Sequence, residues 1–343
     1  MSKLRWKIKQ FYYFFKRHFW NQWRSNRFLK PLHFLRIYLK HKFLNQPYLA
    51  IIETGNICNL TCPTCPTPRN KIKRKSEQMS FENFKKVIDK IKKDIHTILL
   101  YNTNEPLLNP EIEKMIAYAD YCNLHTVIST NATILNEKRT ESLLKSGLDE
   151  ILLCLDGTTK ESYEPFRRGA SFESVLANIS YFCSRKKQLK LVKPFTELQF
   201  IVNKLNQGQV EDVKKIARQI RADKLHIKSL ALNEYAYTKE EIKILAEKFF
   251  PNNVKIKTRY IKIKDKNLIL KNQKDQCSVP DNQITVLVDG RMVICCYDLN
   301  GDYTLGNIFN QSLNVILTQE KSKQLKKMAK DKKLPLCKTC VSD

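Results

Sequence analysis

The sequence has no run of about 20 consecutive apolar residues, so it offers no segment long enough to span a bilayer as a helix. It also lacks a secretory signal, because lysine or arginine interrupts every apolar run near the N-terminus and no small-residue cleavage site follows. The 343 residues include 11 cysteines, and disulfide frameworks belong mostly to exported proteins. We therefore predict a cytoplasmic protein whose clustered cysteines are reduced and act as metal ligands.

Acidic residues are missing from the beginning of the chain, where the first carboxylate is Glu53. Residues 1–47 contain 12 Lys or Arg and all three tryptophans, together with many Phe and Tyr. This mixture is typical of an amphipathic helix at an anionic membrane surface. It also fits a helical arm packed on its own protein or, ranked last, a nucleic-acid-binding patch. The leading prediction is peripheral contact with the inner face of the membrane.

Strand and helix patterns alternate through the middle of the chain. Short apolar runs separate amphipathic stretches that carry capping signals, such as Ser80 before one helix and Gly147 after another. Six strands are predicted between about residues 48 and 230: YLAIIET, HTILLYN, HTVIST, DEILLCLD, ELQFIVN and KLHIKSL. This alternation indicates parallel strands with helical crossovers. The expected fold class is α/β, with a partial (β/α)6 TIM-like barrel.

Four regions are expected along the chain. Residues 1–47 form the basic aromatic arm, 48–235 the partial barrel, 236–276 a helix and linker, and 277–343 a small cluster-binding domain. The last region contains a hairpin in QITVLVDGRMVICC, where alternating apolar residues flank the two-residue turn signal Asp-Gly. No repeat longer than the strand-helix unit and no low-complexity segment are found.

The loop after the first predicted strand reads CNLTCPTC and has no fourth cysteine. Cys58, Cys62 and Cys65 suit one face of a [4Fe–4S] cube, which leaves one iron free to bind an exogenous molecule. A zinc site with a fourth ligand and a chance cluster of inert thiols are the alternatives. Because α/β barrels keep their active sites on the loops after the strands, this loop is predicted to lie at such a site.

Cys-x3-Cys-x2-Cys at the head of strand-helix units resembles the radical S-adenosylmethionine (SAM) superfamily. TNEPLL is similar to the family's Gly-Gly-Glu-Pro segment, which implies that Glu105 lies near the SAM amino group. STNAT is similar to its Ser/Thr-Asn segment, which implies polar contacts to SAM from Ser129 and Asn131. CLDG and the later RRG resemble its Asp-Gly loop and Arg-x-Gly segment. That likeness implies that Asp156 lines the site and that Arg167 faces the SAM carboxylate.

A second group of cysteines lies toward the C-terminus: Cys277, Cys295, Cys296, Cys337 and Cys340. GRMVIC resembles the Gly-x4-Cys element of SPASM and twitch auxiliary-cluster domains. Because the sequence stops three residues after CKTC, we expect the shorter twitch-like form with one auxiliary [4Fe–4S] cluster. Its implied ligands are Cys277, Cys295, Cys337 and Cys340. Cys296 is a rival to Cys295, since adjacent strand residues face opposite ways, and a four-cysteine zinc site is the alternative. The remaining cysteines are expected to be core residues: Cys122, Cys154 and Cys183.

The resemblance implies a radical SAM oxidoreductase with two [4Fe–4S] clusters. A flavodoxin- or ferredoxin-type reductant would supply the electron that splits SAM, and the 5′-deoxyadenosyl radical would take a hydrogen atom from a substrate held in the barrel mouth. The auxiliary cluster could then accept an electron. The expected reaction is oxidation or epimerisation of a sugar, a cyclitol or a membrane-linked saccharide precursor. A ribosomally made peptide ranks lower, and a two-site zinc protein that binds nucleic acid is the non-enzyme alternative.

Overall fold

The structure is a computed structural model that describes residues 29–44, 46–232, 234–252, 260–262, 268–270, 276–338 and 340. Most of the predicted arm, residues 1–28, lies outside this part of the chain, as does most of the predicted linker.

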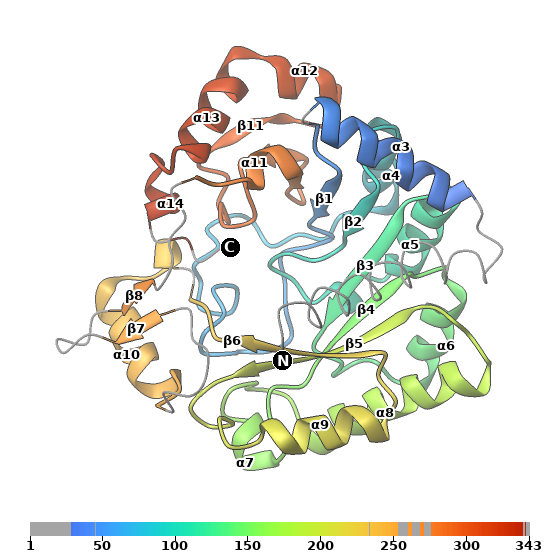
Figure 1. The fold of residues 1–343 in the computed structure, drawn as a ribbon, viewed down its shortest axis with the longest axis vertical. Coiled ribbons are helices and arrows are strands. Elements are labelled where there is room, and N and C mark those ends of the chain that lie inside the picture. Colours follow the sequence, from blue (N-terminus) through green and yellow to red (C-terminus); the bar gives the residue numbers. More distant parts are fainter. Residues whose placement is uncertain are drawn as a thin grey trace.

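One nine-stranded sheet organises the described residues (Figure 1). Six of its strands are parallel and lie side by side in chain order. They are β1 (Leu49–Ile52), β2 (Thr97–Leu99), β3 (His125–Thr130), β4 (Glu150–Cys154), β5 (Phe195–Val202) and β6 (Lys224–Ser229). All six predicted strands are confirmed, and their order is that of an open, partial (β/α)6 barrel.

Helices connect these strands and cover the outer face of the curved sheet (Figure 1). They are α4 (Phe81–Ile91), the short η2 (Pro106–Leu108), α5 (Ile112–Tyr121), α6 (Glu137–Lys145), α7 (Lys160–Tyr163), α8 (Phe172–Gln188) and α9 (Val210–Gln219). The predicted caps are present: the Ser80 side chain accepts a hydrogen bond from the Asn83 amide at the start of α4. Gly147 adopts φ +86° just after α6, where a Cβ would collide with Asp120.

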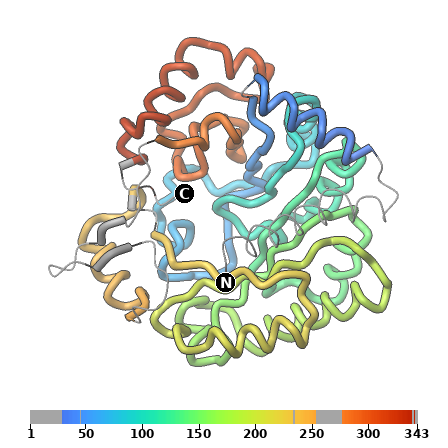
Figure 2. The backbone as a smooth tube through the Cα atoms, viewed as in Figure 1, coloured from blue at the N-terminus to red at the C-terminus, as the bar shows by residue number. Residues whose placement is uncertain are grey.

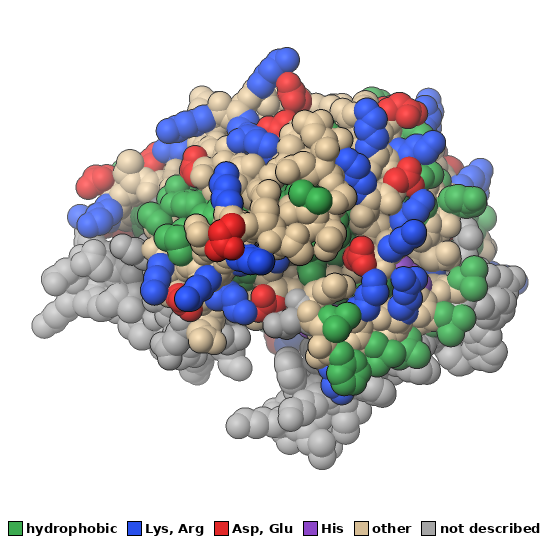
Figure 3. All heavy atoms as spheres, turned by 90° about the horizontal axis from the view of Figure 1, so that it is seen from above, with side chains coloured by type: hydrophobic (Ala, Val, Ile, Leu, Met, Phe, Trp, Pro, Cys, Tyr) green, Lys and Arg blue, Asp and Glu red, His purple; other side chains and the backbone are tan. Residues whose placement is uncertain are grey.

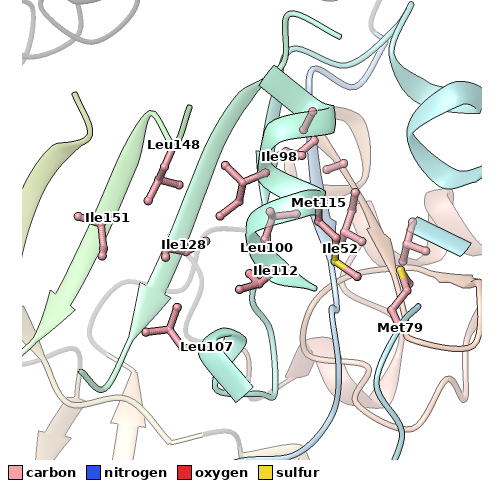
Figure 4. Packing of buried hydrophobic residues seen from close by; sticks show 14 of the residues in the cluster. Ile52, Met79, Ile98, Leu100, Leu107, Ile112, Met115, Ile128, Leu148 and Ile151 are labelled. Carbon is pink, nitrogen blue, oxygen red and sulfur yellow. The ribbon is translucent and has the colours of Figure 1, made fainter. Parts of the chain in front are cut away.

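The hydrophobic core lies between the sheet and these helices (Figure 4). Ile98, Leu100 and Ile128 come from the β2 and β3 region and face Ile112 and Met115 of α5, and all five side chains are fully buried. Burying each such side chain stabilises the fold by about 1.5–3 kcal/mol. Alternate strand residues are committed to this core, so the intervening residues face the barrel interior.

The C-terminal segment extends the sheet beyond β1, so strands from the beginning and the end of the described chain lie side by side (Figure 2). Strand β9 (Gln283–Val286) pairs in parallel with β1, and β10 (Arg291–Val293) and β11 (Thr304–Asn307) follow in antiparallel pairing. The predicted hairpin is confirmed, but its two-residue turn is wrong. Leu287 pairs with Arg291, which leaves a three-residue loop ending at Gly290 with φ +81°.

The remaining elements surround this C-terminal hairpin and the end of the barrel. They are η3 (Glu234–Ala236), α10 (Lys239–Phe249), β7 (Tyr260–Lys262), β8 (Leu268–Leu270), α11 (Val279–Asn282), α12 (Leu313–Thr318), α13 (Glu320–Lys330) and α14 (Pro335–Lys338). Strands β7 and β8 pair only with each other among the described residues.

Helix α3 (Leu29–Leu44) is the described part of the predicted arm. The Lys30 ammonium lies 2.7 Å from the Asp149 carboxylate and 2.8 Å from that of Asp120. The His33 Nε2 atom lies 2.9 Å from the Ile95 carbonyl oxygen. Since Asp149 directly precedes β4 and Ile95 lies two residues before β2, α3 crosses the amino ends of these strands. None of the helices in the described ranges combines the length and hydrophobicity needed to traverse a bilayer.

Candidate active site

A cavity of about 350 Å³ opens where β1 to β4 end at their carboxyl side, and we call it the cysteine cavity. Its lining brings together the three loop cysteines and four of the five side chains predicted to contact SAM: Cys58, Cys62, Cys65, Glu105, Ser129, Asn131 and Arg167. These residues come from four separate strand ends. These side chains meet at the carboxyl edge of the sheet, where α/β barrels have their active sites.

The cysteine loop is held by neighbouring backbone and amide groups. The Thr61 amide donates to the Arg168 carbonyl over 2.9 Å, and the Cys65 amide donates to the Cys62 carbonyl over 3.2 Å. The Asn131 side-chain amide lies 3.8 Å from the Cys58 sulfur and donates to Asn59 over 3.0 Å. Asn131 therefore contacts the loop as well as lining the cavity.

The loop thiols form a soft donor set in which Cys62 is buried and Cys58 and Cys65 are half-buried. Burial raises the pKa of the Cys58 thiol to about 11, the Leu60 amide opposes this rise, and the charge of Glu105 adds to it. Burial also raises the pKa of Cys62, against the opposing positive charge of Arg167. Iron binds cysteine as the thiolate, so a cationic cluster in this cavity would favour the deprotonated form. The thiols and the cavity fit an iron–sulfur cluster in this respect.

No three His, Cys, Asp or Glu side chains within the described residues are arranged to hold one metal ion between them.

Glu105 presents a buried carboxylate to the cysteine cavity. It accepts hydrogen bonds from the Asn131 amide at 2.7 Å, the Thr130 hydroxyl at 2.8 Å and the Leu107 amide at 3.1 Å. Burial raises the pKa of Glu105 to about 6, and these hydrogen bonds limit the rise. The side chain is therefore mostly ionised at neutral pH, and its charge suits an ammonium ligand.

Arg167 and Asp156 form a buried pair behind the cavity. The Arg167 Nε atom donates to Asp156 over 2.7 Å, and its Nη2 atom contacts the same carboxylate. Asp156 also accepts the Ile201 amide at 2.6 Å, and it is fully buried. Only Arg167 lines the cavity. The structure thus places Asp156 where it orients Arg167, whereas the sequence prediction placed it on the cavity wall.

Sequence analysis did not single out several polar residues that line the same space. Cys154 at the end of β4 lines the cysteine cavity, although it was predicted to be a core residue, and Gln199 of β5 lies beside it with Nε2 3.7 Å from the sulfur. A neighbouring cavity of about 350 Å³ shares Arg167 and is also lined by Lys228 of β6. The strand alternation that faces Leu153 and Leu198 into the core was the signal that could have identified Cys154 and Gln199.

Below these residues the barrel interior is charged. Glu197 of β5 is 2.7 Å from both the Lys224 ammonium and the His226 Nδ1 atom of β6. Burial disfavours the ionised form, but these two hydrogen bonds prevail and lower the pKa of Glu197 to about 2. On the other side of the interior, His125 Nε2 lies 2.8 Å from Glu150. The interior is thus lined by polar groups in place of the aliphatic layers that fill closed barrels.

The C-terminal cysteines lie near one another. Burial raises the pKa of the Cys337 thiol to about 11, and the nearby thiolates of Cys277 and Cys340 raise it further. Burial raises the pKa of Cys295 well above its usual range, with added repulsion from Cys296, Cys340 and Cys337. Because these thiols affect one another's pKa, all four predicted auxiliary ligands lie close together, and Cys296 lies close to them as well.

Cys295 and Cys296 do not occupy a strand, because β10 ends at Val293 and the Asp298 amide turns back to the Cys295 carbonyl over 3.1 Å. The argument that strand alternation separates the two thiols is therefore wrong. What distinguishes them is the cavity, since Cys296 lines it and Cys295 does not. Cys295 keeps the auxiliary role as a prediction.

Buried contacts fix the C-terminal region against the barrel. The Glu53 carboxylate of the β1 end accepts the Val288 amide at 3.0 Å and the Arg74 guanidinium at 2.8 Å. Arg74 also donates to the Leu299 carbonyl over 2.7 Å. These contacts hold the segment around Val288 and Leu299 against the end of β1, and Cys296 and Tyr297 from that segment line the cysteine cavity.

Comparison with known families agrees with this arrangement. The profile of the Radical SAM superfamily matches residues 52–192, and that of the SPASM iron-sulfur cluster-binding domain matches residues 277–341. The two matches include the cysteine loop and the C-terminal cysteines, respectively. Domains of these two kinds imply SAM and [4Fe–4S] clusters as cofactors.

Among curated relatives, the chain is 27% identical over 184 residues to an AdoMet-dependent heme synthase of Methanosarcina barkeri, covering 53% of this chain and 50% of that protein. It is 24% identical over 187 residues to a PqqA peptide cyclase of Gluconobacter oxydans, covering 53% and 49%. The alignments thus span about half the length of these relatives.

Solved structures share the fold. Streptococcus suis SuiB bound to precursor peptide SuiA superposes with a TM-score of 0.60 at 14% identity, covering 90% of this chain and 74% of that one. BtrN in complex with AdoMet and 2-DOIA gives 0.52 at 19% identity, covering 86% and 92%. With its cysteine cavity and strand order in agreement, the chain carries a domain of the Radical SAM superfamily over residues 52–192 and a C-terminal SPASM iron–sulfur cluster-binding domain over residues 277–341.

Proposed function

We propose that this protein is a radical SAM oxidoreductase that abstracts a hydrogen atom from a polar substrate held in the barrel interior. The proposal rests chiefly on one observation: three cysteines and a buried carboxylate meet in one cavity that continues into a charged barrel. A [4Fe–4S] cluster bound by Cys58, Cys62 and Cys65 would supply the electron that cleaves SAM to methionine and a 5′-deoxyadenosyl radical.

The chain's own residues would bind SAM and shield the reaction. Glu105 would pair with the SAM ammonium group, and Ser129 and Asn131 would donate or accept hydrogen bonds beside it. Arg167, oriented by Asp156, would pair with the SAM carboxylate. With SAM and substrate bound, the cavity walls would limit the access of water to the reacting groups, and a flavodoxin- or ferredoxin-type partner would deliver the electron.

A sugar or cyclitol, oxidised or epimerised, is the substrate class that we favour. The substrate side of the cavity carries Lys228, Gln199 and Cys154, which can hydrogen-bond hydroxyl groups. Apolar side chains such as Phe166, Ile201 and Leu230 lie beside Lys228. BtrN, which shares this fold, was solved in complex with AdoMet and 2-DOIA. Cysteines of the C-terminal group would hold an auxiliary cluster able to accept the second electron of an oxidation.

A ribosomally made peptide is the second candidate. It is favoured by the likeness to a PqqA peptide cyclase and by the fold shared with SuiB, which was solved with its precursor peptide.

Deuterium transfer distinguishes these candidates. The anaerobically reconstituted protein is incubated with SAM, a reductant and either perdeuterated sugars and cyclitols or deuterated peptides, and 5′-deoxyadenosine is analysed by mass spectrometry. Label from a sugar or cyclitol supports the favoured class, and label from peptides alone overturns it. Iron and sulfide analysis tests the zinc alternative, since two cubes require about eight irons per chain.

A substitution at Lys228 should separate substrate binding from SAM cleavage. In the Lys228→Gln variant we expect SAM cleavage without substrate to stay within about twofold of wild type, because Glu105 and Arg167 are intact. The KM for a transferring substrate should rise at least about fivefold, since a charge-assisted hydrogen bond is lost. Lys214→Gln, at a partly exposed position of helix α9, is the matched control. An unchanged KM in Lys228→Gln would show that Lys228 does not contact the substrate.

SAM affinity should depend on pH through Glu105. With a pKa of about 6, this carboxylate is about one-tenth ionised at pH 5 and almost fully ionised at pH 7.5. The affinity of cluster-loaded protein for SAM should therefore fall about tenfold between pH 7.5 and 5, as measured by equilibrium dialysis. In Glu105→Gln the affinity should be low and flat over this range. A wild-type profile without a change near pH 6 would argue against an ammonium contact at Glu105.

A further inference from the structure

Helix α3 turns four of its large apolar side chains away from the protein, although Ile37 is buried on its inward side. Leu32, Leu35, Leu39 and Phe43 recur at spacings of three or four residues and are between 44% and 73% exposed. With 3.6 residues per turn, this stripe lies about 180° around the helix from the buried Lys30. An ordinary surface helix has the opposite arrangement, with its apolar stripe on the core.

The inward side of α3 buries Ile37 and makes polar contacts that oppose a roll of the helix that would bury the stripe. Lys30 is fully buried between Asp149 and Asp120. One turn from the other end, the Lys40 ammonium lies 2.7 Å from Asp94. Rolling the helix would break a buried ion pair, which costs several kcal/mol. The outward orientation of the stripe is thus set by the inward ion pairs.

We propose that this outward stripe docks the protein on an anionic phospholipid surface. Exposed Arg36 and Lys42 flank the stripe, and no Asp or Glu occurs on α3 or anywhere before Glu53. Seen from above, the molecule shows hydrophobic side chains gathered toward the lower right, interspersed with Lys and Arg (Figure 3). Apolar side chains would enter the headgroup boundary while the cations pair with lipid phosphates.

Charge argues for an anionic lipid over other occupants of the stripe. Residues 1–28 carry eight Lys or Arg and no acid, so laying them on the stripe would place like charges beside Arg36 and Lys42. A second copy would bring the same cations together, and the whole chain has a formal net charge of +27. An anionic bilayer complements both the stripe and the segment that precedes it.

The position of α3 also sets the direction in which the active site faces. The helix covers the amino ends of the strands, whereas the cysteine cavity lies at their carboxyl ends, on the order of 20 Å away for strands of this length. A protein docked through α3 therefore opens its cavity toward the aqueous side. Its substrate arrives from solution, and a saccharide anchored in the same bilayer would lie on the far side of the barrel.

Vesicle sedimentation with the full chain tests the proposal. Vesicles of phosphatidylcholine with about one-third phosphatidylglycerol should bind the wild type, with binding lost in high salt and weak on pure phosphatidylcholine. The L32S/L35S/L39S/F43S variant should bind the anionic vesicles at least about tenfold more weakly, and so should R36E/K42E. Matched controls away from α3 are I244S/V315S and K138E/K145E, which should bind like wild type.

SAM cleavage by each variant reports that it is folded, and vesicle-bound wild type should cleave SAM within about twofold of the free protein. Equal binding by wild type and the four-serine variant would overturn the proposal. So would a wild-type dimer that the four-serine variant dissolves, because the stripe would then belong to a second copy. Because sedimentation does not depend on catalysis, its outcome tests the membrane proposal independently of the proposed function.

Discussion

Replacing any one of Cys58, Cys62 and Cys65 by alanine should abolish SAM cleavage. All three thiols line the same cavity, and a cube bound through only two of them would be unstable and would no longer present its open iron beside Glu105. We expect 5′-deoxyadenosine formation to fall at least about a thousandfold. Iron in the reconstituted protein should fall from about eight to about four per chain, because the C-terminal cysteines are untouched.

Cys122→Ala is the matched control for these variants. Cys122 follows α5, does not line the cavity and is half-buried, so iron content and SAM cleavage should match wild type. If Cys62→Ala formed as much 5′-deoxyadenosine as wild type, the assignment of the cluster to this loop would be wrong. Full loss of iron from a loop variant would instead mean that the two cysteine groups do not load independently.

Replacing Lys30 by methionine should cause the largest loss of stability of any change outside the core. Its ammonium is fully buried, 2.7 Å from Asp149 and 2.8 Å from Asp120. Removing one partner from a buried ion pair costs about 3–5 kcal/mol, because the remaining charges stay in a medium of low dielectric. The measurement is the urea midpoint of reconstituted protein under anaerobic conditions, at constant pH.

The pH dependence of this loss follows from Asp149. Burial disfavours its ionised form, but Lys30, Lys193 and His125 together hold the pKa of this carboxyl well below its usual value of 3.8. A depressed carboxyl pKa contributes stability that is present above the unfolded value and is lost as the pH falls through the folded one. The difference in the free energy of unfolding between Lys30→Met and wild type should therefore be largest at neutral pH and should decrease below about pH 4.

Lys40→Met provides the control. Lys40 is also on α3 and forms an ion pair with Asp94 at 2.7 Å, but this pair is partly exposed. Surface pairs contribute about 0–1 kcal/mol, so this variant should stay close to wild type. Equal losses of stability from the two substitutions would mean that the buried ion pair stabilises the fold no more than the surface pair does. The same pair explains why deleting residues 1–47 would be a poor test of membrane binding: it would strip Lys30 from two buried carboxylates.

Local patterns in the sequence sufficed for the secondary structure and for the chemistry of single loops. The six parallel strands, the Ser80 and Gly147 caps and the cysteine loop could all be predicted, because periodicity, capping and ligand spacing act over a few residues. Glu105, Ser129, Asn131 and Arg167 were found through resemblance. The cavity then brings them together with the three loop cysteines.

Only the tertiary structure decided which side each of these residues faces and what it meets. Cys154 appeared as a core thiol and lines the cavity, Asp156 lies behind Arg167, and Cys295 and Cys296 sit in a turn. The apolar stripe of α3 faces outward because Lys30, 119 residues from Asp149 in the chain, is paired inside. Contacts between such distant segments depend on how the elements pack, and no local pattern of residues encodes that packing.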